Sequence, residues 1–178
     1  MPDPRRPLPP LNSADLERFA LRYVERYATT RAKLAAYLSR KLRERGWDGE
    51  KSPDPEGLAE RMAGLGYVND RLYAESKAGA MARRGLGARR VREALRFAGI
   101  EEEDAAALIP SIEEAEVSSA IAFAKRKRIG PFGREMAERP LQEKQMAAMI
   151  RAGHAPALAR AIVRMAPGDD PEATLAPS

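Results

Sequence analysis

Three glycines divide this 178-residue chain at nearly equal intervals. Gly46, Gly99 and Gly153 each end an amphipathic segment, and they stand 53 and 54 residues apart. Glycine readily adopts the left-handed backbone that ends many helices, because it has no Cβ atom. An apolar residue stands four positions before each glycine: Leu42, Leu95 and Met149. Three unrelated helix ends are the alternative, but a fixed period is typical of stacked units, so we expect an internal repeat.

The spacing of apolar residues predicts helices almost throughout and no strands. We expect an all-α protein of nine helices in three tandem three-helix repeats, over residues 14–68, 69–112 and 113–166. Each set of three helices buries little apolar surface alone, so the repeats are expected to form an elongated, curved stack. Residues 1–13, which are rich in proline, and residues 167–178 are expected to be disordered.

Residues with short polar side chains mark the expected helix starts, because they accept bonds from free N–H groups there. The candidates are Asn12 or Ser13, Thr29 or Thr30, Asp54 before Pro55, and Asn69. Ser111 and Glu114 have the spacing of a capping box and are expected to open the third repeat. The acidic run at residues 101–104 fits the first turn of a helix better than a cation site.

The composition excludes several kinds of chemistry. Cysteine is absent, which excludes disulfides, a thiol nucleophile and a thiolate metal site. The one histidine, His154, belongs to no catalytic motif, so we expect it to pack or cap a helix. No glycine-rich phosphate loop of a nucleotide-binding enzyme is present. We therefore expect a protein that is not an enzyme, with no catalytic residues, no metal and no cofactor.

Charge is segregated along the chain, although the net charge is only +5. Residues 69–99 hold eight basic and three acidic residues, and residues 125–134 hold five basic and no acidic ones. Residues 101–116, between them, hold seven acidic and no basic ones. A solvated face is one interpretation; contact with phosphates or an acidic protein groove is the other. The candidate contact residues are Arg83, Arg84, Arg89, Arg90, Arg92, Lys125, Arg126, Lys127 and Arg128.

Aromatic residues make up only 6% of the chain, and many fall at helical positions that should be buried. They are therefore expected to be too few for a platform on which bases stack. Any binding of single-stranded or double-stranded DNA should then be weak and independent of sequence.

Four motifs occur in order along the chain. They are GYVND at residues 66–70, RGLG at 84–87 with a later EAL and GI, KRKRIGPF at 125–132, and MIRAGH at 149–154. Together they resemble the motifs of the RecX family of bacterial regulatory proteins, over about residues 14 to 166. Asn69 stands where the family often has aspartate, and a capping role tolerates both residues. The first repeat has the fewest such motifs.

The resemblance implies three tandem three-helix repeats and a role that is not catalytic. It implies binding to the RecA recombinase filament, with damping of ATP hydrolysis, coprotease activity and strand exchange in DNA repair, recombination and the SOS response. No apolar run approaches membrane-spanning length and no segment resembles a signal peptide, so we expect a cytoplasmic monomer with no membrane contact. The alternative is a sequence-specific helix-turn-helix DNA-binding protein, in which residues 88–98 read bases through Arg89 or Arg92.

Overall fold

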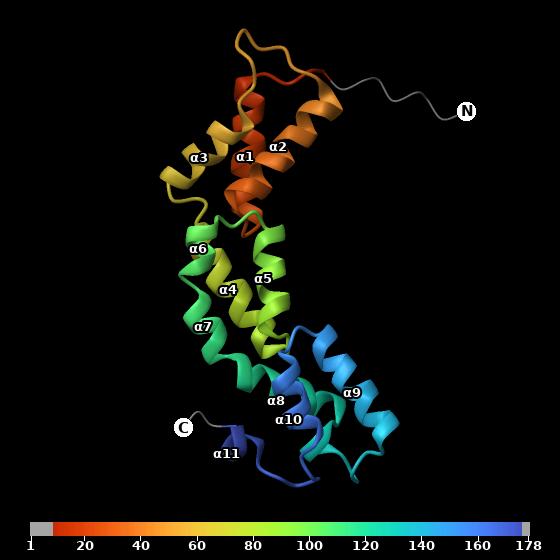
Figure 1. Ribbon diagram of the computed structural model, residues 1–178. Coiled ribbons are helices and arrows are strands. Elements are labelled where there is room, and N and C mark those ends of the chain that lie inside the picture. Colours follow the sequence, from red (N-terminus) through yellow and green to blue (C-terminus); the bar gives the residue numbers. More distant parts are fainter. Residues whose placement is uncertain (1–8, 176–178) are drawn as a thin grey trace, which may run out of the picture. The chain divides into compact units, whose positions relative to one another are not determined.

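The computed structural model describes residues 9–175 of the chain. Its regular structure within that range is helical, apart from one isolated bridge between Leu11 and Trp47, which confirms the expected all-α class (Figure 1). The chain divides into two compact units. The first contains the chain up to Tyr73 together with Ala98–Ile100, and the second contains Ala74–Phe97 and the chain from Glu101 onward.

The first repeat consists of three helices around one core. They are α1 (Ser13–Arg26), α2 (Arg31–Arg45) and α3 (Pro55–Gly64). Their apolar faces meet because each helix carries apolar side chains three or four positions apart. The core residues from these helices include Leu16, Ala20, Leu34, Leu38, Leu58 and Met62.

The predicted helix caps are confirmed at four positions. The side chain of Asn12 accepts a bond from the N–H of Asp15 at 3.0 Å, and that of Thr30 accepts one from Lys33 at 3.2 Å. Asp54 caps α3 through the N–H of Gly57 at 2.8 Å, and Asn69 caps the next helix. These bonds pair N–H groups that have no partner inside their helices.

Part of the arm that the sequence predicted to be disordered is packed against the first repeat. Residues 1–8 of that arm lie outside the described range, but Leu11 is fully buried in the core of the first repeat. Its N–H donates to the carbonyl of Gly46 at 3.0 Å, and its carbonyl accepts from Asp48 at 2.8 Å. The proline-rich composition did not reveal this, because a single apolar residue anchors the segment.

The second repeat contains four helices where three were predicted. They are α4 (Asp70–Arg83), α5 (Ala88–Phe97), α6 (Glu102–Ala106) and α7 (Ile109–Glu114). The acidic run lies in the first turn of α6, as expected. Proline favours the first turn of a helix, so Pro110 starts α7 and divides the helix predicted over this segment.

The capping box predicted at Ser111 and Glu114 is wrong. Ser111 lies inside α7 and not at the start of a helix, and its hydroxyl donates to the carbonyl of Leu108 at 3.0 Å. The first helix of the third repeat, α8, begins only at Glu116.

The third repeat and the end of the described chain lie in the second unit. They comprise α8 (Glu116–Lys127), the short 3₁₀ helix η1 (Gly130–Phe132), α9 (Arg139–Arg151), α10 (Pro156–Val163) and α11 (Pro171–Leu175). The last helix contradicts the disorder predicted for the tail, since Asp170 caps it through the N–H of Glu172 at 2.9 Å. Leu175 also packs against the core of this repeat. Residues 176–178 lie outside the described range.

The three glycines all have the left-handed backbone that the sequence predicted, with φ of 82° at Gly46, 71° at Gly99 and 100° at Gly153. In the second unit, the turn at Gly153 packs against the start of α5. The N–H of Gly87 donates to Ala152 at 2.9 Å, and the N–H of Arg89 donates to Gly153 at 3.2 Å.

The first unit contains an equivalent contact at Gly99. The hydroxyl of Thr30, at the start of α2, donates to the carbonyl of Ala98 at 2.6 Å, and Ala32 lies against Gly99. In both places, the glycine after the second helix of one repeat meets the start of the second helix of the preceding repeat. This recurrence confirms tandem three-helix repeats. At Gly46, in the first repeat, the segment around Leu11 makes the contact instead.

Candidate functional site

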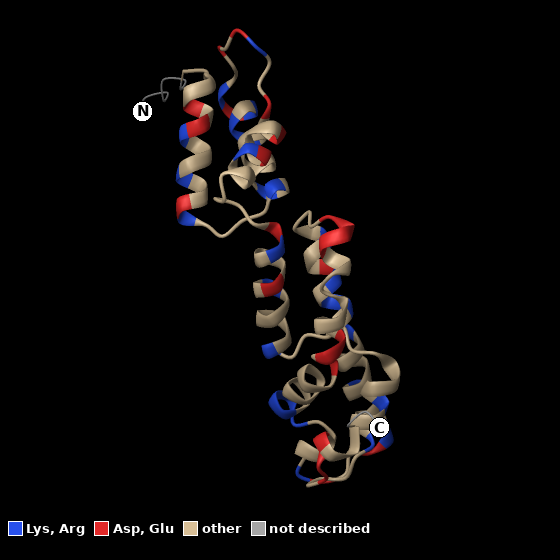
Figure 2. Cartoon of the chain, turned by 90° about the vertical axis from the view of Figure 1, so that its left-hand side faces the viewer, with Lys and Arg blue, Asp and Glu red and all other residues tan. Residues whose placement is uncertain are grey.

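The nine predicted contact residues are all exposed and all belong to the second unit. They come from three segments: the end of α4, the first turns of α5, and the end of α8. Figure 2 shows basic positions in blue and acidic positions in red on these helices. Cations at the end of α8 lie at the negative end of its dipole, which stabilises the helix.

The structure brings two of these segments together. The turn at Gly85 lies against α8, where a Cβ atom added to Gly85 would come within 2.7 Å of the backbone nitrogen of Phe123. The guanidinium of Arg126 donates to the carbonyl of Arg84 and lies 5.5 Å from the centre of the Phe123 ring. Two basic blocks that are about 40 residues apart in sequence therefore meet at one place.

Arg89 and Arg90 have a structural role that the sequence did not reveal. Arg89 donates to the carbonyl of Ile150 at 2.9 Å, and Arg90 donates to that of Arg151 at 3.0 Å. Both also pair with Glu93, at 2.8 and 3.1 Å. The last carbonyls of a helix have no partner within it, so these arginines cap the end of α9. Contact of Arg89 and Arg90 with a partner stays a prediction, and such contact would compete with these bonds.

Six of the nine predicted residues remain available to a partner. Within residues 9–175, their side chains make no hydrogen bond or ion pair, and all are exposed. We call these residues the unpaired basic set: Arg83, Arg84, Arg92, Lys125, Lys127 and Arg128. An exposed cation without a protein partner can bind a carboxylate or phosphate without first breaking an internal ion pair.

His154 has the packing role that the sequence predicted. Its side chain is buried, its Nε2 donates to the carbonyl of Gly85 at 3.1 Å, and its ring meets the edge of Phe123. Its Nδ1 is buried without a hydrogen-bond partner among the described residues. Burial lowers the pKa of His154 below 6.5, and the bond to Gly85 and the charge of Glu116 offset this only in part.

The lowered pKa of His154 predicts a loss of stability in mild acid. The unfolded chain takes up the proton first, so the contribution of His154 is complete above about pH 6.5 and is lost as the pH falls through the folded-state pKa. The free energy of unfolding should fall by at most about 1.4 kcal/mol per pH unit there. Urea titrations of wild type and His154→Gln between pH 7.5 and 5.5 measure this, and equal slopes would contradict it.

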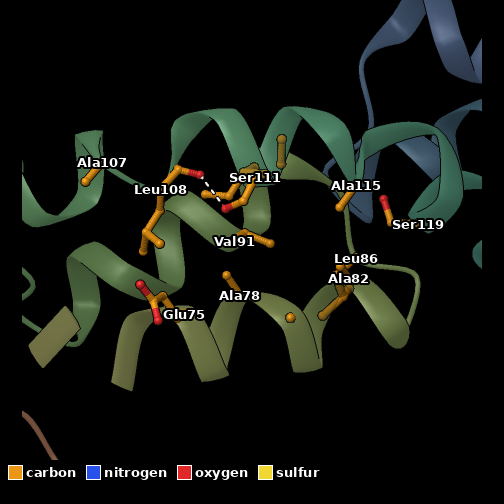
Figure 3. A pocket seen from close by; sticks show the side chains of 13 residues that line it. Glu75, Ala78, Ala82, Leu86, Val91, Ala107, Leu108, Ser111, Ala115 and Ser119 are labelled. Atoms are coloured by element: carbon orange, nitrogen blue, oxygen red, sulfur yellow. Dashed lines mark hydrogen bonds between the residues drawn. The ribbon is translucent and has the colours of Figure 1, made fainter. Parts of the chain in front are cut away.

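The second unit also contains an apolar groove of about 360 Å³ between α4, α5 and α7 (Figure 3). Alanine, valine and leucine side chains line most of it, and its polar side chains are Glu75, Ser111 and Ser119. The hydroxyl of Ser111 is engaged with Leu108.

The described part of the chain holds no cluster of three acidic or histidine residues that could bind a metal ion. No helix within residues 9–175 has both the length and the apolar character that crossing a bilayer requires.

Fold and surface together define an all-helical repeat protein with exposed, unpaired basic groups. A family model for the second three-helix domain of RecX matches residues 69–109. The chain is also 31% identical to Regulatory protein RecX of Myxococcus xanthus (strain DK1622), over 156 residues and 83% of each chain. This chain therefore belongs to the RecX family.

Two solved structures share the fold. The crystal structure of RecX from Lactobacillus salivarius aligns with a TM-score of 0.65 and 21% identity, over 85% of this chain and 94% of that one. A crystal structure of regulatory protein RecX aligns with a TM-score of 0.57 and 22% identity, over 84% and 72%. These likenesses support the tandem three-helix architecture.

Proposed function

We propose that this chain binds the filament that RecA recombinase forms on DNA and inhibits its ATPase, coprotease and strand-exchange activities. Family membership supports the class of partner, and the relatives carry the name regulatory protein. The observation that supports a place of contact is the unpaired basic set on the second unit. The role is regulatory, not catalytic.

Arginine and lysine suit the surface of such a filament, which exposes phosphates and carboxylates. The planar guanidinium of arginine binds either group through two parallel bonds. By contacting neighbouring recombinase subunits, the bound chain blocks filament growth or favours disassembly. Because a ligand shifts an equilibrium only through unequal affinity for its states, the chain must bind the active and inactive filaments differently.

DNA outside the filament is a weaker partner in this proposal. Exposed basic groups bind phosphates of any sequence, and the affinity falls as salt rises. The chain acts as a monomer in the cytoplasm, where the recombinase filament forms.

The geometry disfavours the alternative of a helix-turn-helix protein that reads bases through α5. A recognition helix contacts bases with its N-terminal residues. Here the start of α5 packs against the turn at Gly153, and Arg89 and Arg90 bind the end of α9. A base-reading helix would have to give up these bonds.

The direct test is recombinase ATPase on single-stranded DNA with the purified chain titrated in. The proposal expects inhibition that saturates, with a midpoint that follows the filament concentration. In a second titration, the chain is added before the nucleotide cofactor, when the filament has not yet formed. Comparison of the two orders of addition distinguishes a block of filament growth from disassembly of a formed filament. ATPase that stays unchanged at saturating chain would refute the proposed function.

A further inference from the structure

The first repeat carries an aromatic and basic groove that the proposed function does not use. It lies between α1 and α2, within the first unit, and has a volume of about 480 Å³. That volume falls within the range of about 300–1,000 Å³ that is common for ligand pockets. The groove holds three of the five tyrosines in the chain.

The tyrosines form a continuous series of rings. Tyr23 lies in the last part of α1 and Tyr27 is the residue that caps the end of that helix; their ring centres are 5.2 Å apart. Tyr23 also stacks on Tyr37 of α2, with ring centres 4.2 Å apart and an angle of 23° between the rings. Tyr23 and Tyr37 are half-buried against the core, whereas Tyr27 is 49% exposed. About half of the surface of the outermost ring is therefore exposed, and the guanidinium of Arg26 lies over that ring.

Basic side chains flank these rings. Arg22 and Arg26 come from α1, and Arg40 and Lys41 come from α2. The guanidinium of Arg26 lies 5.4 Å from the centre of the Tyr27 ring, and that of Arg40 lies 5.5 Å from the centre of the Tyr37 ring. Arg22, Arg26 and Arg40 are exposed.

No carboxylate is among the described residues that line the groove. Glu44, one turn further along α2, pairs with Arg40 at 3.6 Å and with Lys41 at 2.7 Å. The bond from Lys41 lowers the pKa of Glu44, which therefore stays ionised. One acidic group thus partly neutralises two of the four basic groups, and the groove keeps an excess of positive charge.

We propose that this groove binds single-stranded nucleic acid. A base stacks on the exposed ring of Tyr27, while Arg22 and Arg26 pair with the phosphates on either side. A positive groove combined with aromatic rings is how proteins hold single strands without reading their sequence. Duplex DNA hides the faces of its bases, and a peptide of aspartate and glutamate has no flat rings, so neither uses the whole groove.

This assignment revises the expectation that aromatic residues are too few for stacking. The composition counts rings but does not show that two helices bring three of them together. Binding remains independent of sequence, because every base has a face that can stack. The groove is also separate from the unpaired basic set, which lies in the other unit.

The first experiment separates stacking from charge. Fluorescence anisotropy measures how the full-length chain binds a labelled 12-mer of thymidine and an abasic 12-mer with the same phosphates. Tyr27→Ala should weaken binding to the thymidine strand on the order of tenfold and leave binding to the abasic strand unchanged. Tyr27→Phe should bind both strands as wild type does. Tyr67→Ala is the matched control, since Tyr67 is 54% exposed and lies outside the groove.

The second experiment tests the charged residues of the groove. Removal of basic side chains should weaken binding, and removal of the acidic charge of Glu44 should tighten it. Arg22→Ala with Arg26→Ala should weaken binding of both strands and reduce the slope against salt by roughly 0.7 for each phosphate that is no longer bound. Glu44→Gln should tighten binding several-fold, because it frees Arg40 and Lys41. Arg43→Ala, on the same helix but outside the groove, should change little. Circular dichroism melting verifies that each variant folds.

The proposal is overturned if Tyr27→Ala binds the thymidine strand as wild type does while the variant is folded. It is also overturned if a duplex or polyglutamate competes as well as the single strand. A uridine 12-mer tests whether the groove also binds RNA. Binding equal to that of the thymidine strand indicates a groove for either nucleic acid, and weaker binding indicates a groove for single-stranded DNA. No recombinase is present in these assays, so their failure would leave the proposed filament function standing.

Discussion

Gly87→Ala is expected to lower the free energy of unfolding by about 3 kcal/mol, the upper end of the usual cost of overpacking. A Cβ atom at this position would lie 2.3 Å from the carbonyl carbon of Gly153 and 2.4 Å from the nitrogen of His154. Both are backbone atoms, so no side-chain rotation relieves the clash. The turn at Gly153 and the start of α5 would have to separate, and the bond from Gly87 to Ala152 would break.

Gly64→Ala is the matched control, because no atom lies within 4 Å of its Cβ position and Gly64 ends a helix without a left-handed backbone. Alanine favours the helix, so this variant should gain roughly 0.5 to 1 kcal/mol. Urea denaturation followed by circular dichroism measures both changes. Equal stability of Gly87→Ala and wild type would contradict the close packing of the two turns.

Alanine substitution of the residue four positions before each glycine should also lower the free energy of unfolding. The size of this effect should differ among the repeats. Leu95 and Met149 are almost completely buried, whereas Leu42 is only partly buried. Leu95→Ala and Met149→Ala should each lower the free energy of unfolding by about 2 to 5 kcal/mol, because each leaves a cavity in a packed core. Leu42→Ala should cost clearly less, because its site is open to water and can relax.

The same denaturation experiment measures the three alanine variants side by side. The single tryptophan, Trp47, packs against the core of the first repeat, so its fluorescence adds a local probe of Leu42→Ala. A cost for Leu42→Ala as large as that for Met149→Ala would contradict the difference in burial.

Local signals in the sequence predicted much of the fold. Asn12, Thr30, Asp54 and Asn69 act as helix caps because their side chains need only the next turn of their own helix. The glycines end helices for an equally local reason, the absence of a Cβ atom. The elongated, curved arrangement of the repeats stays a prediction.

Contacts between distant residues could not be predicted in this way. Asp70 belongs to a recognisable motif, but only the structure places its buried carboxylate against the N–H of Arg31, at 2.9 Å. The sequence did not show that Arg89 and Arg90 bind backbone carbonyls, because those carbonyls are 61 residues away along the chain. The tyrosine groove was missed for the same reason, since its rings come from two helices.

The central claim is that the unpaired basic set of the second unit holds the recombinase filament. Its most direct test compares ATPase inhibition by wild type with inhibition by a triple variant, Arg84→Glu, Lys125→Glu and Lys127→Glu. Three exposed charges elsewhere provide a control with the same change of net charge: Arg43→Glu, Lys51→Glu and Arg160→Glu. Three surface contacts together are worth about 1.4 kcal/mol, so the triple variant should need at least about tenfold more protein for half-inhibition, while the control stays within about twofold. Full inhibition by the triple variant at wild-type concentrations would contradict the claim.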